Sequence, residues 1–255
     1  MQDTRTDGAP EAADSGDGSF GRRQALQKIG VGGAILWGAP MIIGSSPAQA
    51  AGSTCGDRTL SWRAQNQDPL TLPKTIVLDD VTVTISQAFY GGSSSYSPGG
   101  DPDLDVLNGP YGGVGTSADS FLQFYQSAVQ NGGRTITVSF AKTGFPAQPL
   151  AVKNINFWVT DIDYTTNQYD DLVFLTPTFT KANPAGSNVI GTGTTGDAFR
   201  NNNQGNVAVT AVGGTTKVTR AAAVSTFTLD FRCGPRASGG HHAIFVSDLK
   251  FNTCP

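Results

Sequence analysis

Short segments in which apolar and polar residues alternate constrain the fold of this chain more than any other feature. Residues 81–86 read Val-Thr-Val-Thr-Ile-Ser, and the same alternation recurs at 135–140, 154–159 and 226–231. A period of two places every second side chain on one face, as in a β-strand with one buried and one solvated face. These segments therefore predict strands that cover a common core.

Glycine-rich segments such as 131–133 and 212–214 separate the strand candidates and carry turn chemistry. One window, 121–129 (FLQFYQSAV), predicts a single short helix, and the last run, 243–251, predicts a strand with Phe245, Leu249 and Phe251 on one face. The pattern predicts an all-β fold: an antiparallel β-sandwich, jelly-roll-like, with at most one short helix.

The N-terminal 50 residues have a different character. Arg22 and Arg23 precede a glycine-diluted apolar stretch, and Ala48 and Ala50 offer small residues for cleavage, which is the order of an export signal. The paired arginines resemble the twin-arginine class of bacterial signal, and an ordinary Sec signal is the alternative. We expect 1–50 to be cleaved and 51–255 to be a single β-sandwich domain, secreted or held at the cell surface without a membrane anchor.

Charge excludes several classes of partner and fold. Only 15% of residues are charged and the net charge is −3, which is too little for a coiled coil and provides no basic surplus for nucleic acid. The chain also lacks the G-x-S-x-G and H-E-x-x-H motifs of hydrolases. The sequence therefore favours a non-enzymatic protein.

The three cysteines, Cys55, Cys233 and Cys254, predict one disulfide and one free thiol in an oxidising compartment. If strands at 224–232 and 243–251 formed a hairpin, Cys233 and Cys254 would lie about 30 Å apart, too far to bond. Cys55–Cys254 is then the favoured disulfide. If the two strands belong to different sheets, the argument lapses and Cys233 becomes a candidate again.

Two acidic clusters make calcium the one cofactor that the sequence suggests. Alternating carboxylates resemble oxygen-rich calcium loops, and closely spaced carboxylates repel one another unless they are solvated or neutralised. Well-solvated turn residues are the alternative. The candidate calcium ligands are Asp101, Asp103, Asp105, Asp161, Asp163, Asp170 and Asp171.

Three long segments, 91–119, 181–204 and 235–242, are predicted loops, and the last contains both histidines, which we expect to be structural or surface residues. Loops on a rigid sandwich are common places for binding sites. Aromatic rings in or beside them suit the apolar faces of sugars. The candidate ligand-binding residues are Tyr96, Tyr111, Tyr164 and Tyr169.

Two stretches, 154–175 (NINFWVTDIDYTTNQYDDLVFL) and 227–251 (FTLDFRCGPRASGGHHAIFVSDLKF), resemble the lectin-like jelly-roll domains of CshA-type fibrillar adhesins. The resemblance implies adhesion, through a surface glycan or protein ligand, without catalysis. The sequence lacks the long repeats and wall anchor of those adhesins. The alternatives are a secreted hydrolase acting on cell-wall or polysaccharide substrates and a structural envelope protein.

Overall fold

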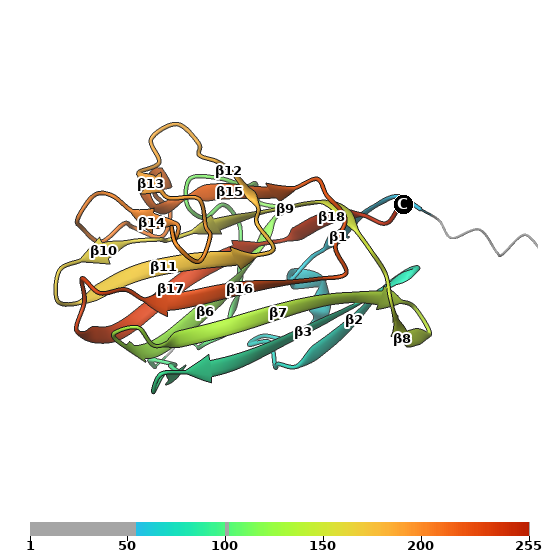
Figure 1. Ribbon diagram of the computed structural model, residues 1–255, viewed down its shortest axis with the longest axis horizontal. Coiled ribbons are helices and arrows are strands. Elements are labelled where there is room, and N and C mark those ends of the chain that lie inside the picture. The colour runs from blue at the N-terminus through green and yellow to red at the C-terminus, as the bar shows by residue number, and fades with distance from the viewer. Residues whose placement is uncertain (1–54, 100–101, 255) are drawn as a thin grey trace, which may run out of the picture. The chain divides into compact units, whose positions relative to one another are not determined.

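The computed structural model describes residues 55–99 and 102–254, which belong to one compact unit built from two antiparallel sheets and a small two-stranded ribbon (Figure 1). The first sheet contains β1 (Asp57–Leu60), β4 (Ser94–Ser95), β5 (Val106–Asn108), β6 (Ser120–Val129), β9 (Lys153–Thr160), β12 (Thr180–Ala182), β15 (Thr216–Arg220), β17 (Gly239–Ser247) and β18 (Leu249–Asn252). The second contains β2 (Lys74–Leu78), β3 (Val81–Tyr90), β7 (Gly133–Lys142), β8 (Phe145–Pro149), β10 (Tyr164–Thr165), β11 (Tyr169–Thr176) and β16 (Thr226–Cys233).

The remaining elements lie in the connections. The ribbon pairs β13 (Val189–Ile190) with β14 (Arg200–Asn201), and the short 3₁₀ turns are η1 (Arg63–Gln65) and η2 (Val212–Gly214). Within the described residues, no helix is long and apolar enough to cross a membrane. The predicted all-β antiparallel sandwich is confirmed.

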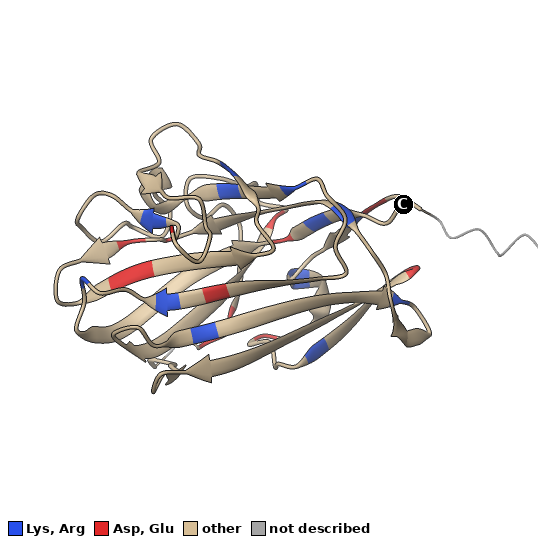
Figure 2. Ribbon diagram, viewed as in Figure 1, with Lys and Arg blue, Asp and Glu red and all other residues tan. Residues whose placement is uncertain are grey.

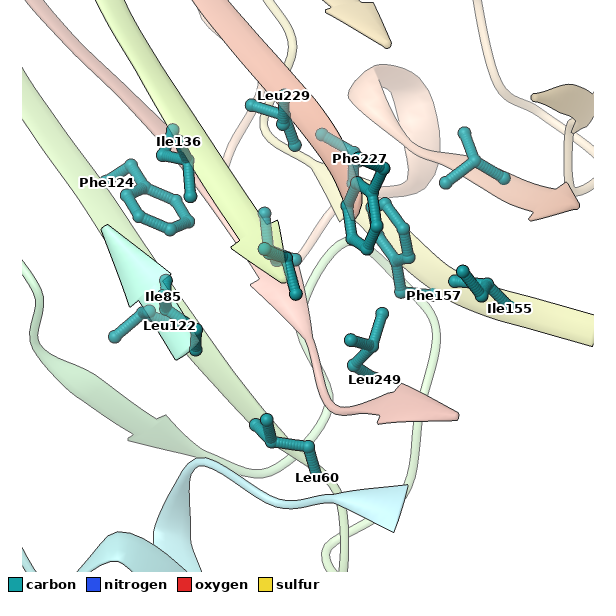
Figure 3. Packing of buried hydrophobic residues seen from close by; sticks show 14 of the residues in the cluster. Leu60, Ile85, Leu122, Phe124, Ile136, Ile155, Phe157, Phe227, Leu229 and Leu249 are labelled. Atoms are coloured by element: carbon teal, nitrogen blue, oxygen red, sulfur yellow. The ribbon is translucent and has the colours of Figure 1, made fainter. Parts of the chain in front are cut away.

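Apolar side chains from the facing sides of the two sheets fill the space between them (Figure 3). Leu122 of β6 and Phe157 of β9 contribute from the first sheet, while Ile136 of β7 and Leu229 of β16 contribute from the second. Each is at most 3% exposed, and burying one such side chain contributes about 1.5–3 kcal/mol to folding. The alternation read from the sequence is therefore the pattern that forms this core.

The helix predicted at 121–129 is wrong, because these residues form most of strand β6. The strand pairs with β17 over nine residues, from Phe121↔Ser247 to Val129↔Gly239. Its first five residues are all buried, and on the outer face of the strand the Tyr111 ring lies 5.5 Å from the Phe121 ring. An apolar residue on both faces hides the period of two that marks the other strands.

The face predicted for the run 243–251 is right for Leu249 and Phe251, which share the core, and wrong for Phe245, because Asp248 interrupts the run. The Asp248 carboxylate accepts hydrogen bonds from the backbone N–H groups of Trp62 (3.0 Å) and Ser120 (3.1 Å). This residue separates β17 from β18 and shifts the alternation by one position. Leu249 consequently shares the core with Ile244 and Val246, whereas Phe245 lies on the opposite face of the sheet.

The predicted Cys55–Cys254 disulfide is confirmed, with 4.7 Å between the two Cα atoms. The hairpin used to predict it is not present, because β16 pairs with β7 and β11 in the second sheet while β17 belongs to the first. Cys233 is the free thiol, and it lies wholly buried. The pairing is right although the reasoning that led to it placed the strands wrongly.

Burial of Cys233 gives a simple chemical prediction. We expect an aromatic disulfide reagent to leave this thiol unmodified in the native protein and to modify one thiol per chain after denaturation in urea without reductant, because a thiol must be accessible to react. Absorbance of the released thiolate measures both states. Rapid modification of the native protein would contradict the buried placement.

Candidate functional site

The candidate site lies beside the first half of β17, where that strand lacks a strand neighbour on one side. β17 pairs with β6 along its whole length but with β9 only at Phe245 and Val246. β9 ends at Thr160, and the chain then crosses through 161–163 toward β10 in the second sheet. The early end of β9 leaves an opening bordered by residues from both sheets.

The crossing segment is fixed by its backbone. The N–H of Ile162 donates to the carbonyl of Gly214 (3.0 Å), and the Asn201 side-chain amide donates to the carbonyl of Ile162 (3.0 Å). Ile162 is wholly buried in the core, so the flanking Asp161 and Asp163 are held in place on either side of it. Asp161 adopts φ 64°, a left-handed conformation that Asp and Asn tolerate better than most residues.

Asp163 and Asp171 contact each other through backbone and side chain. The Asp171 N–H donates to the Asp163 carbonyl (3.0 Å), and the Asp163 N–H donates to Asp171 Oδ2 (3.2 Å). Asp163 Oδ2 also accepts the N–H of Val207 (3.2 Å). Two carboxyl groups that come from different segments of the chain therefore share one small volume.

A hydrogen bond between the two sheets completes the cluster. His242 of β17 and Asp171 of β11 both point into the space between the sheets, and 2.8 Å separates His242 Nδ1 from Asp171 Oδ1. Both side chains are at most 2% exposed. Two further atoms of the cluster, Asp161 Oδ1 and His242 Nε2, are buried without a hydrogen-bond partner among the described residues.

Burial dominates the electrostatics of these acids. It raises the pKa of Asp161 well above its ordinary value, and the neighbouring Asp163 raises it further. Burial, with Asp171 next to it, raises the pKa of Asp163 to about 9. Burial also raises the pKa of Asp171, whereas hydrogen bonds from Asp163 lower it. Asp163 therefore keeps its proton at neutral pH, while its backbone N–H donates to the Asp171 carboxyl group.

Aromatic and amide side chains surround the acids in a pocket of about 260 Å³. His241 stacks on Tyr96 with 3.5 Å between ring centroids, and Tyr96 meets the Tyr125 ring edge-on at 5.2 Å. We call this site the acid–aromatic pocket. Its principal polar and aromatic lining residues are Gln123, Tyr125, Asp161, Asp163, Tyr169 and His242.

The predicted tyrosines divide according to their contacts. Tyr169 lines the pocket, and Tyr96 lies next to it through His241. Tyr111 packs on Phe245, itself a lining residue, at 5.4 Å between ring centroids. Tyr164 is not among the lining residues, and the Arg236 guanidinium covers one face of its ring at 3.6 Å from the centroid.

The predicted acidic residues also separate. Asp161, Asp163 and Asp171 come together, but Asp170 faces the other side of β11 and accepts hydrogen bonds from Arg236, including Nε at 2.9 Å. Successive residues of a strand point to opposite faces, so adjacent Asp170 and Asp171 cannot serve one site.

The other predicted acidic cluster does not form a separate site in the described residues. Asp103 is buried against Arg134, with 2.9 Å between Nη1 and Oδ1, while Asp105 lies on the short approach to β5. Asp101 lies outside the described residues. Within 55–99 and 102–254, no group of three or more His, Cys, Asp or Glu side chains is arranged to hold a metal ion. Calcium binding stays a prediction.

Sequence reasoning missed the histidines and the β6 residues of the pocket. The segment 235–242 was expected to be a loop, yet His241 and His242 belong to β17. The signal was available, since His242 is in phase with the core residues Ile244 and Val246, and a histidine on a core face requires a polar partner. Gln123 and Tyr125 carried no signal once their strand had been interpreted as a helix.

Comparison with known proteins adds no relative: no protein-family model, curated protein or solved structure matches the chain.

Proposed function

We propose that this protein is an exported, non-enzymatic β-sandwich module that binds a surface carbohydrate in the acid–aromatic pocket. The observation that carries the proposal is the juxtaposition of the Tyr125 and Tyr169 rings with the Asp163 carboxyl group and the Gln123 amide in one pocket. Sugars are recognised by this combination, because ring faces cover their C–H surfaces while carboxyl and amide groups bond to their hydroxyls.

The size of the pocket supports a short ligand. Its volume of about 260 Å³ lies just below the range of about 300–1,000 Å³ for drug-sized ligands. A pocket of this size suits one sugar unit at a chain end better than a groove along a polysaccharide. The resemblance to CshA-type adhesin domains supports the same class of ligand.

Export is part of the proposal. The leader at 1–50 has the order of a cleavable signal, and Cys55–Cys254 is the kind of bond that persists in an oxidising compartment outside the cytosol. Together they favour a protein that functions in solution outside the cell or at its surface.

A glycan array with calorimetric follow-up tests the binding function. We expect a restricted set of glycans to bind the purified protein, and Tyr169→Ala to weaken that binding by about two- to tenfold, because an aromatic contact contributes about 0.5–1.5 kcal/mol. Phe145→Ala is the matched control, since Phe145 is an exposed aromatic residue of β8 outside the pocket. Absence of any glycan binding, or equal losses in both variants, would contradict the proposal.

A hydrolase is the second candidate, favoured by one specific observation. Asp163 keeps its proton at neutral pH, as the general acid of a glycoside hydrolase must. Incubating the glycans that bind with the protein and measuring new reducing ends separates the two functions. Turnover that disappears in Asp163→Asn would establish the hydrolase and exclude a purely binding role.

A further inference from the structure

The acid–aromatic pocket contains three aspartates and no basic side chain of Lys or Arg among its described lining residues. Asp161, Asp163 and Asp171 influence one another electrostatically. Arg236 does not neutralise the cluster, because Asp170 on the other face of β11 and the carbonyl of Asn201 engage its guanidinium. Figure 2 shows a red band near the beginning of β11, the strand that contains Asp170 and Asp171.

Asp161 Oδ1 and His242 Nε2, the two buried atoms of the cluster without partners among the described residues, both require a hydrogen-bond donor or a cation. His242 Nδ1 lies 2.8 Å from Asp171 Oδ1, and in the tautomer that donates from Nδ1 to the ionised Asp171 carboxylate, Nε2 presents a lone pair. Asp161 Oδ1 is likewise an acceptor whenever its carboxyl group is ionised. Buried polar atoms are almost always paired, so each of these two acceptors calls for a donor or a cation.

An organic ammonium group meets these requirements better than a metal ion. An ammonium provides three N–H donors and a positive charge, and aromatic rings stabilise it through cation–π attraction. Tyr125, Tyr169 and Phe245 all line the same pocket. Calcium instead takes six to eight oxygen ligands, gains nothing from ring faces, and finds no triad of acidic or histidine side chains arranged for it in the described residues.

We propose that the acid–aromatic pocket binds the free ammonium group of an amino sugar, with Asp161 and Asp163 as its counter-ions and the tyrosine rings as its walls. This inference rests on the proposed carbohydrate-binding function and names the substrate class. It predicts that a sugar with a free amine binds more tightly than the same sugar after N-acetylation, because acetylation removes the charge.

Binding of an ammonium group has a proton balance. Asp163, whose pKa burial raises to about 9, is protonated in the unliganded protein at neutral pH and releases its proton to solvent when it becomes a counter-ion. Burial raises the pKa of Asp161 in the same direction. Affinity is therefore expected to rise between pH 5 and pH 7, provided the amine stays charged. A neutral sugar that only forms hydrogen bonds has no such proton release.

Titration calorimetry with chitosan and chitin oligomers of equal length tests the inference. We expect the chitosan oligomer to bind at least tenfold more tightly at pH 7, and its binding to weaken at least tenfold at pH 5. The heat of binding is expected to change with the ionisation enthalpy of the buffer, which reports the released proton. The chitin oligomer is expected to show neither pH dependence nor buffer dependence.

A pair of charge-matched variants assigns the effect to the pocket. Asp161→Asn is expected to reduce the preference for the free amine at least fivefold, and asparagine suits the left-handed backbone at this position. Asp197→Asn removes the same charge from an exposed turn outside the pocket and is expected to keep the preference. A thermal melt of each variant confirms that it folds.

The outcomes separate the inference from the function on which it rests. Equal binding of both oligomers would overturn the ammonium site and keep carbohydrate binding. If both oligomers bind and a calcium chelator abolishes the binding, the ammonium site is overturned in favour of a calcium site. Binding of a lysine-containing peptide but of no sugar would keep the ammonium site and overturn carbohydrate recognition, and binding of neither would overturn both.

Discussion

Replacing Arg134 with methionine is expected to lower the free energy of unfolding by about 3–5 kcal/mol, because it leaves a buried carboxylate without its charge partner. Arg134 of β7 is wholly buried, and its Nη1 lies 2.9 Å and 3.0 Å from the two carboxylate oxygens of Asp103. Its guanidinium also lies over the rings of Phe89 (4.9 Å) and Phe124 (5.6 Å). Urea denaturation at pH 7 measures the loss.

A second variant separates the charge effect from packing. Adding Asp103→Leu to Arg134→Met removes the unpaired carboxylate and is expected to recover part of the lost stability. Recovery stays incomplete, because Asp103 also accepts hydrogen bonds from Ser95 Oγ (2.8 Å) and the Tyr125 N–H (2.9 Å). The exposed Arg200→Met is the control, with an expected change within about 0.5 kcal/mol. A loss below about 1 kcal/mol for Arg134→Met would show that the ion pair is not held as described.

The free energy of unfolding is expected to fall as pH rises from 5 to 8, and the titration of Asp163 in the acid–aromatic pocket is expected to set the slope. The pKa of Asp163 is about 9 in the folded protein, against an ordinary value of 3.8. Between these values the folded chain retains a proton that the unfolded chain has released, so the free energy of unfolding falls by up to about 1.4 kcal/mol per pH unit for this group. The contribution is complete below about pH 4 and is lost as pH passes through about 9.

Asp163→Asn isolates this contribution, because asparagine has no proton to lose. We expect the variant to have a shallower decline than the natural protein and to exceed it in stability at pH 8. Urea denaturation at pH 5, 6, 7 and 8 measures both slopes, with Asp197→Asn as the exposed control that keeps the natural slope. Parallel slopes in Asp163→Asn and the natural protein would show that Asp163 titrates near its ordinary pKa.

The fold was readable from the sequence wherever a strand has one buried and one solvated face. That condition holds for β3, β7, β9 and β16, whose buried patterns alternate as predicted. It fails for β6, which is covered on both sides, and at Asp248, where one residue shifts the phase. Neither failure is visible in the local pattern, because the ring that packs on the outer face of β6 and the partners of Asp248 come from other segments of the chain.

The candidate site was only partly readable for the same reason. The spacing of Asp161 and Asp163 placed two acids together, and Tyr169 and Asp171 followed nearby in the sequence. His242, Tyr125 and Gln123 come from strands that join the site only through sheet pairing and the packing of one sheet on the other. The sequence also could not show that β9 ends before β17 does, and this difference in length creates the pocket.

The disulfide at the ends of the sandwich has a mechanical consequence. Cys55 and Cys254 lie next to the paired strands β1 and β18, whereas His242 lies ten residues earlier than Asn252 along the almost continuous β17–β18 path, about 33 Å away. A force applied between the two chain ends passes through the covalent bond and leaves the strands unloaded. A force between a chain end and a ligand in the pocket instead runs parallel to the strands, so many backbone hydrogen bonds resist it in shear at once.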